Sequence, residues 1–134
     1  MIEEKIHATW HTNNRDVWLV VHGAEGNTFY SFLINCDGIQ DPVVSETGQG
    51  RTIGLEYGSA RGTLKLSPNS ERIADVHSNL SEEGVLNEAV IEIGSFDAST
   101  GSIEIEQEKV LGTNFIHKSY SCGFSPNSNV LYWS

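Results

Sequence analysis

The stretch from Asn87 to Lys109 constrains the fold most, because its hydrophobic side chains recur at every second residue. Ala89, Ile91 and Ile93 would share one face of an extended segment, and a period of two is typical of a half-buried strand. After a polar turn, Ile103 and Ile105 continue the same alternation. This stretch therefore predicts a β-hairpin that buries its isoleucines.

The opposite face of this hairpin is expected to be exposed and acidic. From residue 73 to residue 108 the chain has nine acidic residues and no Lys or Arg, whereas the rest has nine acidic and eight basic residues. Nearly all of the net charge of -10 therefore comes from one segment. We predict a binding face for a cationic partner, with a solubilising surface as the alternative. The residues of this acidic face are Glu88, Glu92, Glu104, Glu106 and Glu108.

Other segments alternate in the same way and are separated by turn-forming residues. The segment 16–22 is apolar on both faces, so we expect it to be a central strand that is covered on two sides. With the short loop 23–27 it predicts a hairpin to residues 28–35. Only Ser81 to Ala89 indicates a helix, of one or two turns. The remaining expected strands are 3–11, 51–57, 63–66, 72–77, 114–120 and 130–133.

Roughly ten short strands with at most one short helix predict an antiparallel β-sandwich, with a β-barrel as the alternative. A length of 134 residues fits one domain, residues 1–134. We expect no internal repeat, because no stretch resembles another, and no linker divides the chain.

Composition excludes several classes of partner. A net charge of -10 argues against nucleic acid, whose phosphates need clustered basic residues, and against anionic membranes. The chain has neither an apolar run of about 20 residues nor a signal peptide, which predicts cytoplasmic synthesis. In a reducing compartment Cys36 and Cys122 are expected to be free thiols. A disulfide between them is the alternative.

Motifs for catalysis or metal binding are absent from the sequence. His7 and His11 would share a strand face, but about 13 Å would separate them, too far for one ion. We therefore predict no histidine metal site and no cofactor. A calcium site in the acidic loop from Asp37 to Asp41 is an alternative. Neither a nucleophile elbow nor a phosphate-binding loop is present, which predicts that the chain is not an enzyme.

The charge pattern predicts a non-enzymatic protein–protein contact module, a homo-oligomeric subunit of a repeated assembly such as a virion or a phage tail or capsid. The acidic face of one subunit would meet a basic face of the next, head to tail. Two faces on the same side of the domain would instead neutralise each other, and the hypothesis would lose its basis. The residues of this basic face are Arg51, Arg61, Lys65 and Arg72.

Two other functions are alternatives. A monomeric inhibitor or immunity-type protein would present its carboxylates to a basic protein partner. A lectin-like module would bind a small ligand on an exposed aromatic platform, for which Trp10 and Trp133 are candidates. Trp18 is expected in the core, because its segment is apolar on both faces.

Overall fold

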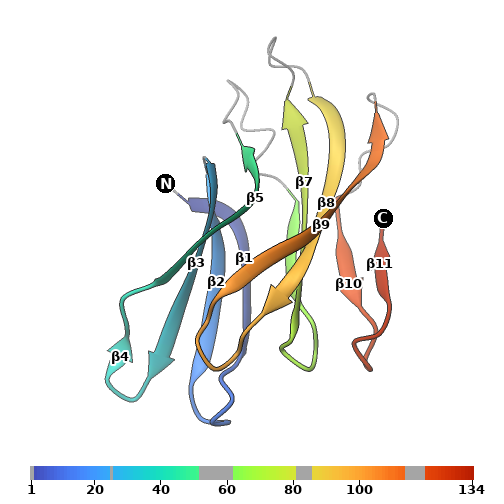
Figure 1. Ribbon diagram of the computed structural model, residues 1–134. Coiled ribbons are helices and arrows are strands. Elements are labelled where there is room, and N and C mark those ends of the chain that lie inside the picture. Colours follow the sequence, from blue (N-terminus) through green and yellow to red (C-terminus); the bar gives the residue numbers. More distant parts are fainter. Residues whose placement is uncertain (1, 25, 52–61, 81–85, 114–119) are drawn as a thin grey trace.

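The computed structural model describes residues 2–24, 26–51, 62–80, 86–113 and 120–134, and all regular structure in these residues is β-strand (Figure 1). The helix expected from Ser81 to Ala89 is wrong from Leu86 onward, which is strand; residues 81–85 lie outside the described residues. The strands are β1 (Ile2–Trp10), β2 (Val17–Gly23), β3 (Gly26–Asn35), β4 (Gly38–Ile39), β5 (Val43–Arg51), β6 (Thr63–Leu66), β7 (Arg72–Leu80), β8 (Leu86–Phe96), β9 (Ile103–Thr113), β10 (Cys122–Phe124) and β11 (Leu131–Trp133).

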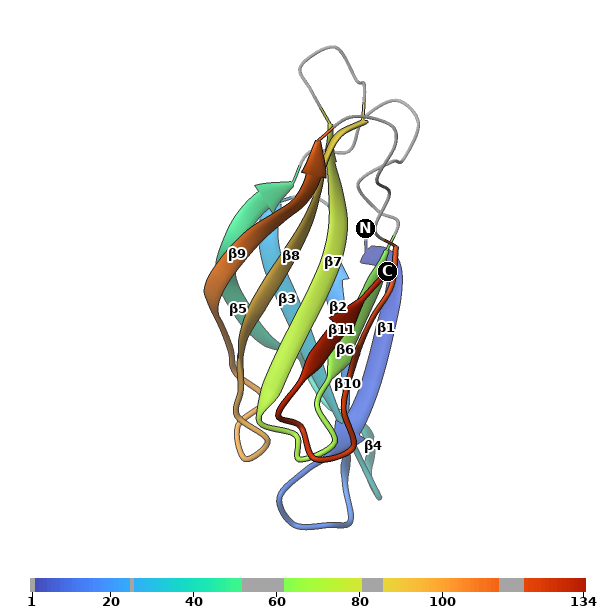
Figure 2. The same ribbon diagram turned by 90° about the vertical axis from the view of Figure 1, so that its right-hand side faces the viewer.

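The strands form three antiparallel sheets. Sheet A has the order β1-β2-β3-β4, with β5 also paired to β3. Sheet B has the order β6-β7-β8-β9, and sheet C is the hairpin β10–β11. Sheets A and B pack face to face, while sheet C lies on the other side of sheet B (Figure 2). The predicted sandwich-like β fold is confirmed; the sheets do not close, so the barrel alternative is wrong.

Sheet B is buried on both of its faces. Between sheets A and B lies an apolar core that includes Trp18, Phe29, Ile73 and Phe96. A second core between sheets B and C contains Ala74, Val76, Ile91 and Cys122, with Phe124 and Leu131 packed against it. Strands β7 and β8 contribute side chains to both cores: Ile73 and Phe96 to the first, and Ala74, Val76 and Ile91 to the second.

Both predicted hairpins are present. Strands β2 and β3 pair with Val17 opposite Ile34 and Val21 opposite Tyr30. Strands β8 and β9 pair across the predicted turn, with Phe96 opposite Ile103. The strands expected from residues 52–57 and 114–119 lie outside the described residues. No helix that could cross a membrane occurs in the described part of the chain.

A four-residue turn occurs twice, so the expectation of no internal repeat is wrong. Ser67–Ser70 joins β6 to β7, and Ser125–Ser128, with the same sequence SPNS, joins β10 to β11. In each turn the first serine hydroxyl donates to the asparagine side chain at 2.7 Å. The last serine has a positive φ in both, 59° and 62°. The turn between β6 and β7 and the turn between β10 and β11 therefore share both sequence and conformation.

Strand β1 exposes its apolar face and turns its polar face inward. Ile6 and Trp10 are 55% and 60% exposed, whereas Lys5 is 3% exposed. The polar side chains face inward because they have partners there. The Leu66 amide donates to Nδ1 of His7 at 3.1 Å, and Thr9 and Ser70 share a hydrogen bond between their hydroxyls. Burial, with Lys65 nearby, lowers the pKa of His7.

Candidate functional site

One part of the interior between sheets A and B is charged. It contains Lys5 from β1, Asp75 and His77 from β7, and Glu92 from β8, all of them buried. Burying charged groups is costly unless they pair with one another or bind an ion. These four residues, the charged cluster, form the candidate functional site.

The strand geometry brings three of these residues together. Asp75 and His77 are two positions apart on β7, so their side chains point to the same face. Glu92 lies opposite Asp75 in the register between β7 and β8. One donor atom from each of the three residues lies within 4.8 Å of the others. The distance between Nδ1 of His77 and Oε2 of Glu92 is 3.8 Å.

Sheet A contacts this cluster from the other side. The Lys5 ammonium donates to Oδ1 of Asp75 at 2.9 Å and to the Val76 carbonyl at 3.4 Å. The backbone amide of Gln49, on β5, donates to Oε1 of Glu92 at 2.6 Å. Gly48 has a φ of +80°, and a Cβ atom there would collide with the Glu92 carboxylate. Glycine thus permits the close approach of β5 to Glu92.

The structure corrects the predicted position of Glu92. It was expected on the exposed acidic face, but it is 0% exposed. The predicted hairpin buries Ile91 and exposes Glu92. In the structure both are buried, on opposite faces of sheet B: Ile91 faces sheet C and Glu92 faces sheet A. Sequence reasoning also missed Asp75 and His77 as site residues. The available signal was their placement at alternate positions between the apolar residues of β7.

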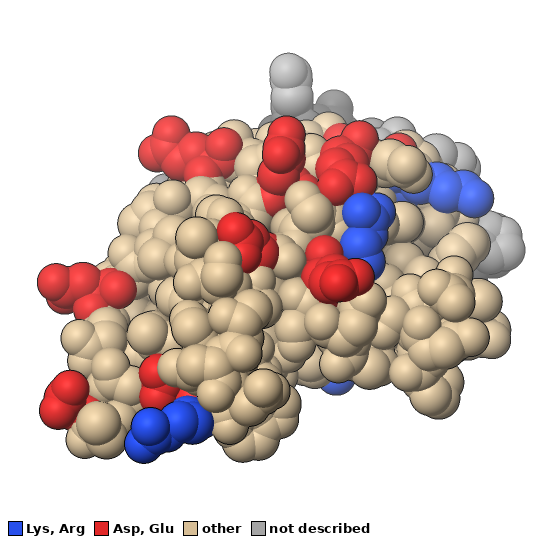
Figure 3. Space-filling model, turned by 60° about the horizontal axis from the view of Figure 1, so that its bottom comes forward, with Lys and Arg blue, Asp and Glu red and all other residues tan. Residues whose placement is uncertain are grey.

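Arg72, from the predicted basic face, lies beside the acidic side chains of β9. Glu104, Glu106 and Glu108 are exposed on β9. Nη1 of Arg72, from the predicted basic face, lies 3.0 Å from Oε2 of Glu106. Figure 3 shows acidic and basic side chains intermixed on the same surface. Arg72 and Glu106 therefore neutralise each other, so the separation of charge that head-to-tail assembly would need is absent at this pair.

Three other predicted site residues cannot be placed in the same way. The backbone of Glu88 belongs to β8 and that of Arg51 ends β5, but neither side chain is described. Arg61 lies outside the described residues. Lys65 is half-buried on β6. The basic face is thus represented by Lys65 and Arg72 alone among described side chains.

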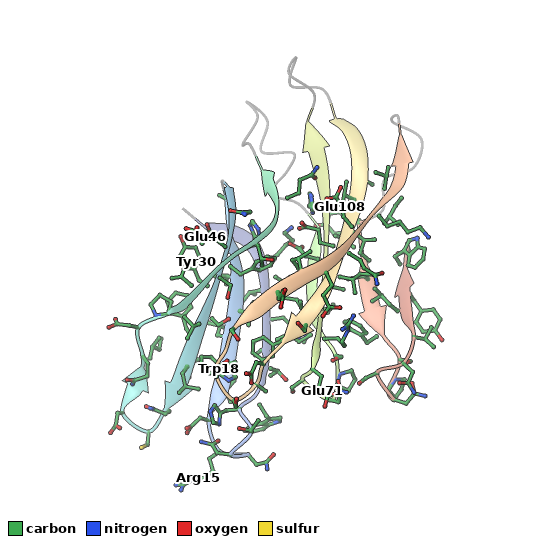
Figure 4. The ribbon with its side chains drawn as sticks, viewed as in Figure 1. Arg15, Trp18, Tyr30, Glu46, Glu71 and Glu108 are labelled. Carbon is green, nitrogen blue, oxygen red and sulfur yellow. The ribbon has the colours of Figure 1, made fainter. Side chains whose placement is uncertain are left out.

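The cysteines and tryptophans have distinct environments. Cys36 is an exposed free thiol, and Cys122 is a buried free thiol, whose burial raises its pKa to about 12. Trp18 lies in the core and donates its indole N–H to the Ala98 carbonyl at 2.9 Å (Figure 4). Trp10 and Trp133 are 60% and 45% exposed, and they belong to different sheets.

Comparisons with known proteins bear on the fold. Neither a family model nor a curated protein sequence matches the chain. The chain is similar to a solved structure from Bacteroides fragilis, which is described as a candidate 6-phosphogluconolactonase. The TM-score is 0.52 and the identity 17%, over 93% of this chain and 30% of that one. The chain thus spans less than a third of that protein's length, and the likeness concerns the fold.

This comparison overturns the function predicted from the sequence. The similar structure is described as an enzyme. The interpretation as a contact module of a repeated assembly is wrong, and its alternatives as inhibitor or lectin-like module are withdrawn with it. The ion pair between Arg72 and Glu106 gives the physical reason, because the proposed charge separation does not exist there.

Proposed function

We propose that this chain is a metal-binding β-domain in which Asp75, His77 and Glu92 hold one divalent ion of the zinc type. The observation that carries the proposal is the convergence of three donor atoms within 4.8 Å of one another on side chains that are all 0% exposed. An imidazole nitrogen and carboxylate oxygens are donors that zinc accepts.

The donor geometry suits a small ion. Two ligands bonded at about 2.1 Å to a tetrahedral ion lie about 3.4 Å apart. The observed 3.8 Å between His77 Nδ1 and Glu92 Oε2 is close to that separation. Calcium fits less well, because it takes six to eight oxygen ligands, whereas one of these three donors is a nitrogen. The three donor atoms lie within 4.8 Å of one another, so they would have to move closer together, and the fourth position of a tetrahedral ion would be taken by a ligand other than these three.

Lys5 and Gln49 would act as partners of the ligands. Carboxylates that bind metals are commonly hydrogen-bonded by a second group, which orients them. Lys5 contacts one oxygen of Asp75, and the Gln49 amide contacts one oxygen of Glu92. Each of these contacts involves one oxygen of a carboxylate that has two. The positive charge of Lys5 beside Asp75 would repel a divalent ion and so lower the affinity of the site for it.

The proposed role of the ion is structural. Its ligands come from β7 and β8 of sheet B, and their hydrogen-bond partners come from β1 and β5 of sheet A. An ion at this position would strengthen the contact between the two sheets. A catalytic role has less support, because side chains that are 0% exposed offer a substrate no surface to meet.

Zinc titration by calorimetry, with protein first treated with a chelator, tests this proposal. We expect one equivalent to bind to the wild type. His77→Gln and Glu92→Gln should each weaken binding by more than about tenfold, because each loses a ligand or its charge. His11→Gln and Glu104→Gln alter a histidine and a carboxylate outside the cluster and should bind as the wild type does.

Circular dichroism of each variant checks that it folds. Glu92→Gln keeps a side-chain oxygen that can accept from Gln49, so it is the variant expected to disturb the fold least. Absence of stoichiometric zinc binding to the wild type would refute the proposal. Equal loss of affinity in the control and ligand variants would refute it as well, since the ion would then bind elsewhere.

A further inference from the structure

The outer face of sheet A is largely apolar, and most of its side chains are exposed or half-buried in the part of the chain that the structure describes. Trp18, Val20 and Phe29 of the inner face belong to the core. The alternate residues point away from sheet B, and no described strand lies over them (Figures 1 and 2). The residues of this outer face of sheet A are Ile6, Ala8, Trp10, Val17, Leu19, Tyr30, Phe32, Ile34 and Val44. Val21, opposite Ile6 and Tyr30, lies on the same face but is 2% exposed and adds nothing to the accessible patch.

The strand register makes these side chains one continuous patch. Trp10 lies opposite Val17, which lies opposite Ile34. The next row joins Ala8, Leu19 and Phe32 in the same way. Within these two rows every side chain is apolar. Figure 4 shows Tyr30 and Glu46 together on sheet A, with Glu46 at the end of the patch.

Several of these side chains are well exposed. Ile6 is 55%, Trp10 60% and Val44 53% exposed, and Ile39 on the neighbouring β4 is 68% exposed. Four strands and three alternate rows cover about 20 Å by 20 Å, on the order of 400 Å². Apolar patches of roughly 300–600 Å² are the largest that monomers normally carry and are often functional. A patch of this size and continuity indicates an interface.

The chain itself shows how such a face is covered. The outer side of sheet B carries Ala74, Val76 and Ile91, and sheet C covers it with Phe124 and Leu131. The partner of an apolar sheet face in this fold is therefore another β-layer. Strands that are apolar on both faces are normally buried on both. The part of the chain that the structure describes has no such layer over sheet A.

We propose that two copies of this chain pack against each other through the outer faces of sheet A, as a two-fold symmetric dimer. A two-fold interface brings one surface patch onto itself, and the two central rows bring no like charges together. The interface would bury on the order of 800 Å² in projection, which is at the weak end of specific interfaces. We therefore expect a reversible dimer that depends on concentration and persists at high salt.

Sedimentation velocity from about 1 µM to about 100 µM is the test, since this range brackets a micromolar dissociation constant. We expect the mass to rise from one chain to two, equally at low and high salt. Trp10→Lys should weaken the dimer by at least about tenfold, because a charge would enter the interface. Tyr132→Lys is the matched control: Tyr132 is an aromatic residue, 63% exposed, on sheet C.

Three outcomes would overturn the proposal. A monomer over the whole range would show that a second copy does not cover this face. Growth beyond two copies would contradict a closed two-fold contact. Dissociation by Tyr132→Lys, with Trp10→Lys unaffected, would place the contact on sheet C. Both substitutions are at exposed positions, so both variants are expected to fold.

Discussion

The interior between sheets A and B has two unlike parts. In the apolar part, Trp18 and Phe96 pack edge to face with ring centroids 6.4 Å apart. In the charged part, the Lys5 ammonium donates to the Asp75 carboxylate, and the Glu92 carboxylate accepts from the Gln49 amide. Strand β8 contributes to both parts, through Phe96 and Glu92. The two parts therefore contribute differently to stability. Burial of apolar side chains stabilises the fold, whereas burial of an ionic cluster costs desolvation and adds little net stability. The proposed ion would give such a cluster a role in the fold.

The largest expected effect is from Lys5→Met. This substitution leaves Asp75 buried beside an apolar side chain, so we expect the free energy of unfolding to fall by about 3–5 kcal/mol. Arg72→Met removes the exposed pair with Glu106 and is expected to change it by at most about 1 kcal/mol. Urea unfolding of both variants measures the difference. Equal, small losses of unfolding free energy would contradict this expectation, because the buried Lys5–Asp75 pair would then contribute no more than an exposed ion pair.

Two glycines allow a matched test of the two parts. Gly101, with φ +79°, has Trp18 Cη2 only 2.6 Å from an ideal Cβ, and Gly48, with φ +80°, has Glu92 in the same relation. We expect Gly101→Ala to lower the free energy of unfolding by about 1–3 kcal/mol and to leave zinc affinity unchanged. Gly48→Ala should also weaken zinc binding by about 10–100-fold, because it displaces a ligand.

Calorimetric zinc titration of the two alanine variants, with urea unfolding of each, makes this comparison. If Gly101→Ala weakened zinc binding as much as Gly48→Ala did, the loss would reflect general destabilisation and not the position of Glu92.

The smallest expected effect is a pH dependence from His7. Burial and Lys65 lower its pKa in the folded protein, so the unfolded chain binds a proton more readily. Stability from His7 is therefore complete above the ordinary pKa of about 6.5 and is lost as pH falls towards the folded value. Comparing the free energy of unfolding of the wild type and His7→Gln from about pH 7.5 to about 5.5 tests this. A difference that stayed constant with pH would contradict it.

The sequence pattern predicted the strands better than their orientation. Alternation identified the hairpins β2–β3 and β8–β9 and the sandwich-like fold, because a period of two depends on local geometry. It does not say which face is inward. For β1 the polar face with Lys5 and His7 is inside, and for β8 Glu92 is inside, because their partners lie on other sheets.

The charged cluster was not predictable from local sequence. Lys5 and Asp75 are 70 positions apart, and Gln49 and Glu92 are 43 apart, so neither spacing forms a motif. The histidine of the cluster is His77, and no motif in the sequence distinguishes it from the other histidines. The accessible apolar outer face of sheet A was not predictable from local sequence either. The sequence predicts that the segment 16–22 is covered on both sides. In the structure Val20 lies in the core, whereas on the opposite face Val21 is buried and Val17 and Leu19 are half-buried.

The most direct test of the central claim is anomalous X-ray diffraction at the zinc edge from crystals of the zinc-loaded protein. We predict a single strong peak between His77, Glu92 and Asp75, within about 2.0–2.2 Å of one donor atom from each. The same crystals of Glu92→Gln should show this peak weakened or absent. A peak at surface residues such as Glu104, or none between β7 and β8, would contradict the proposed metal centre.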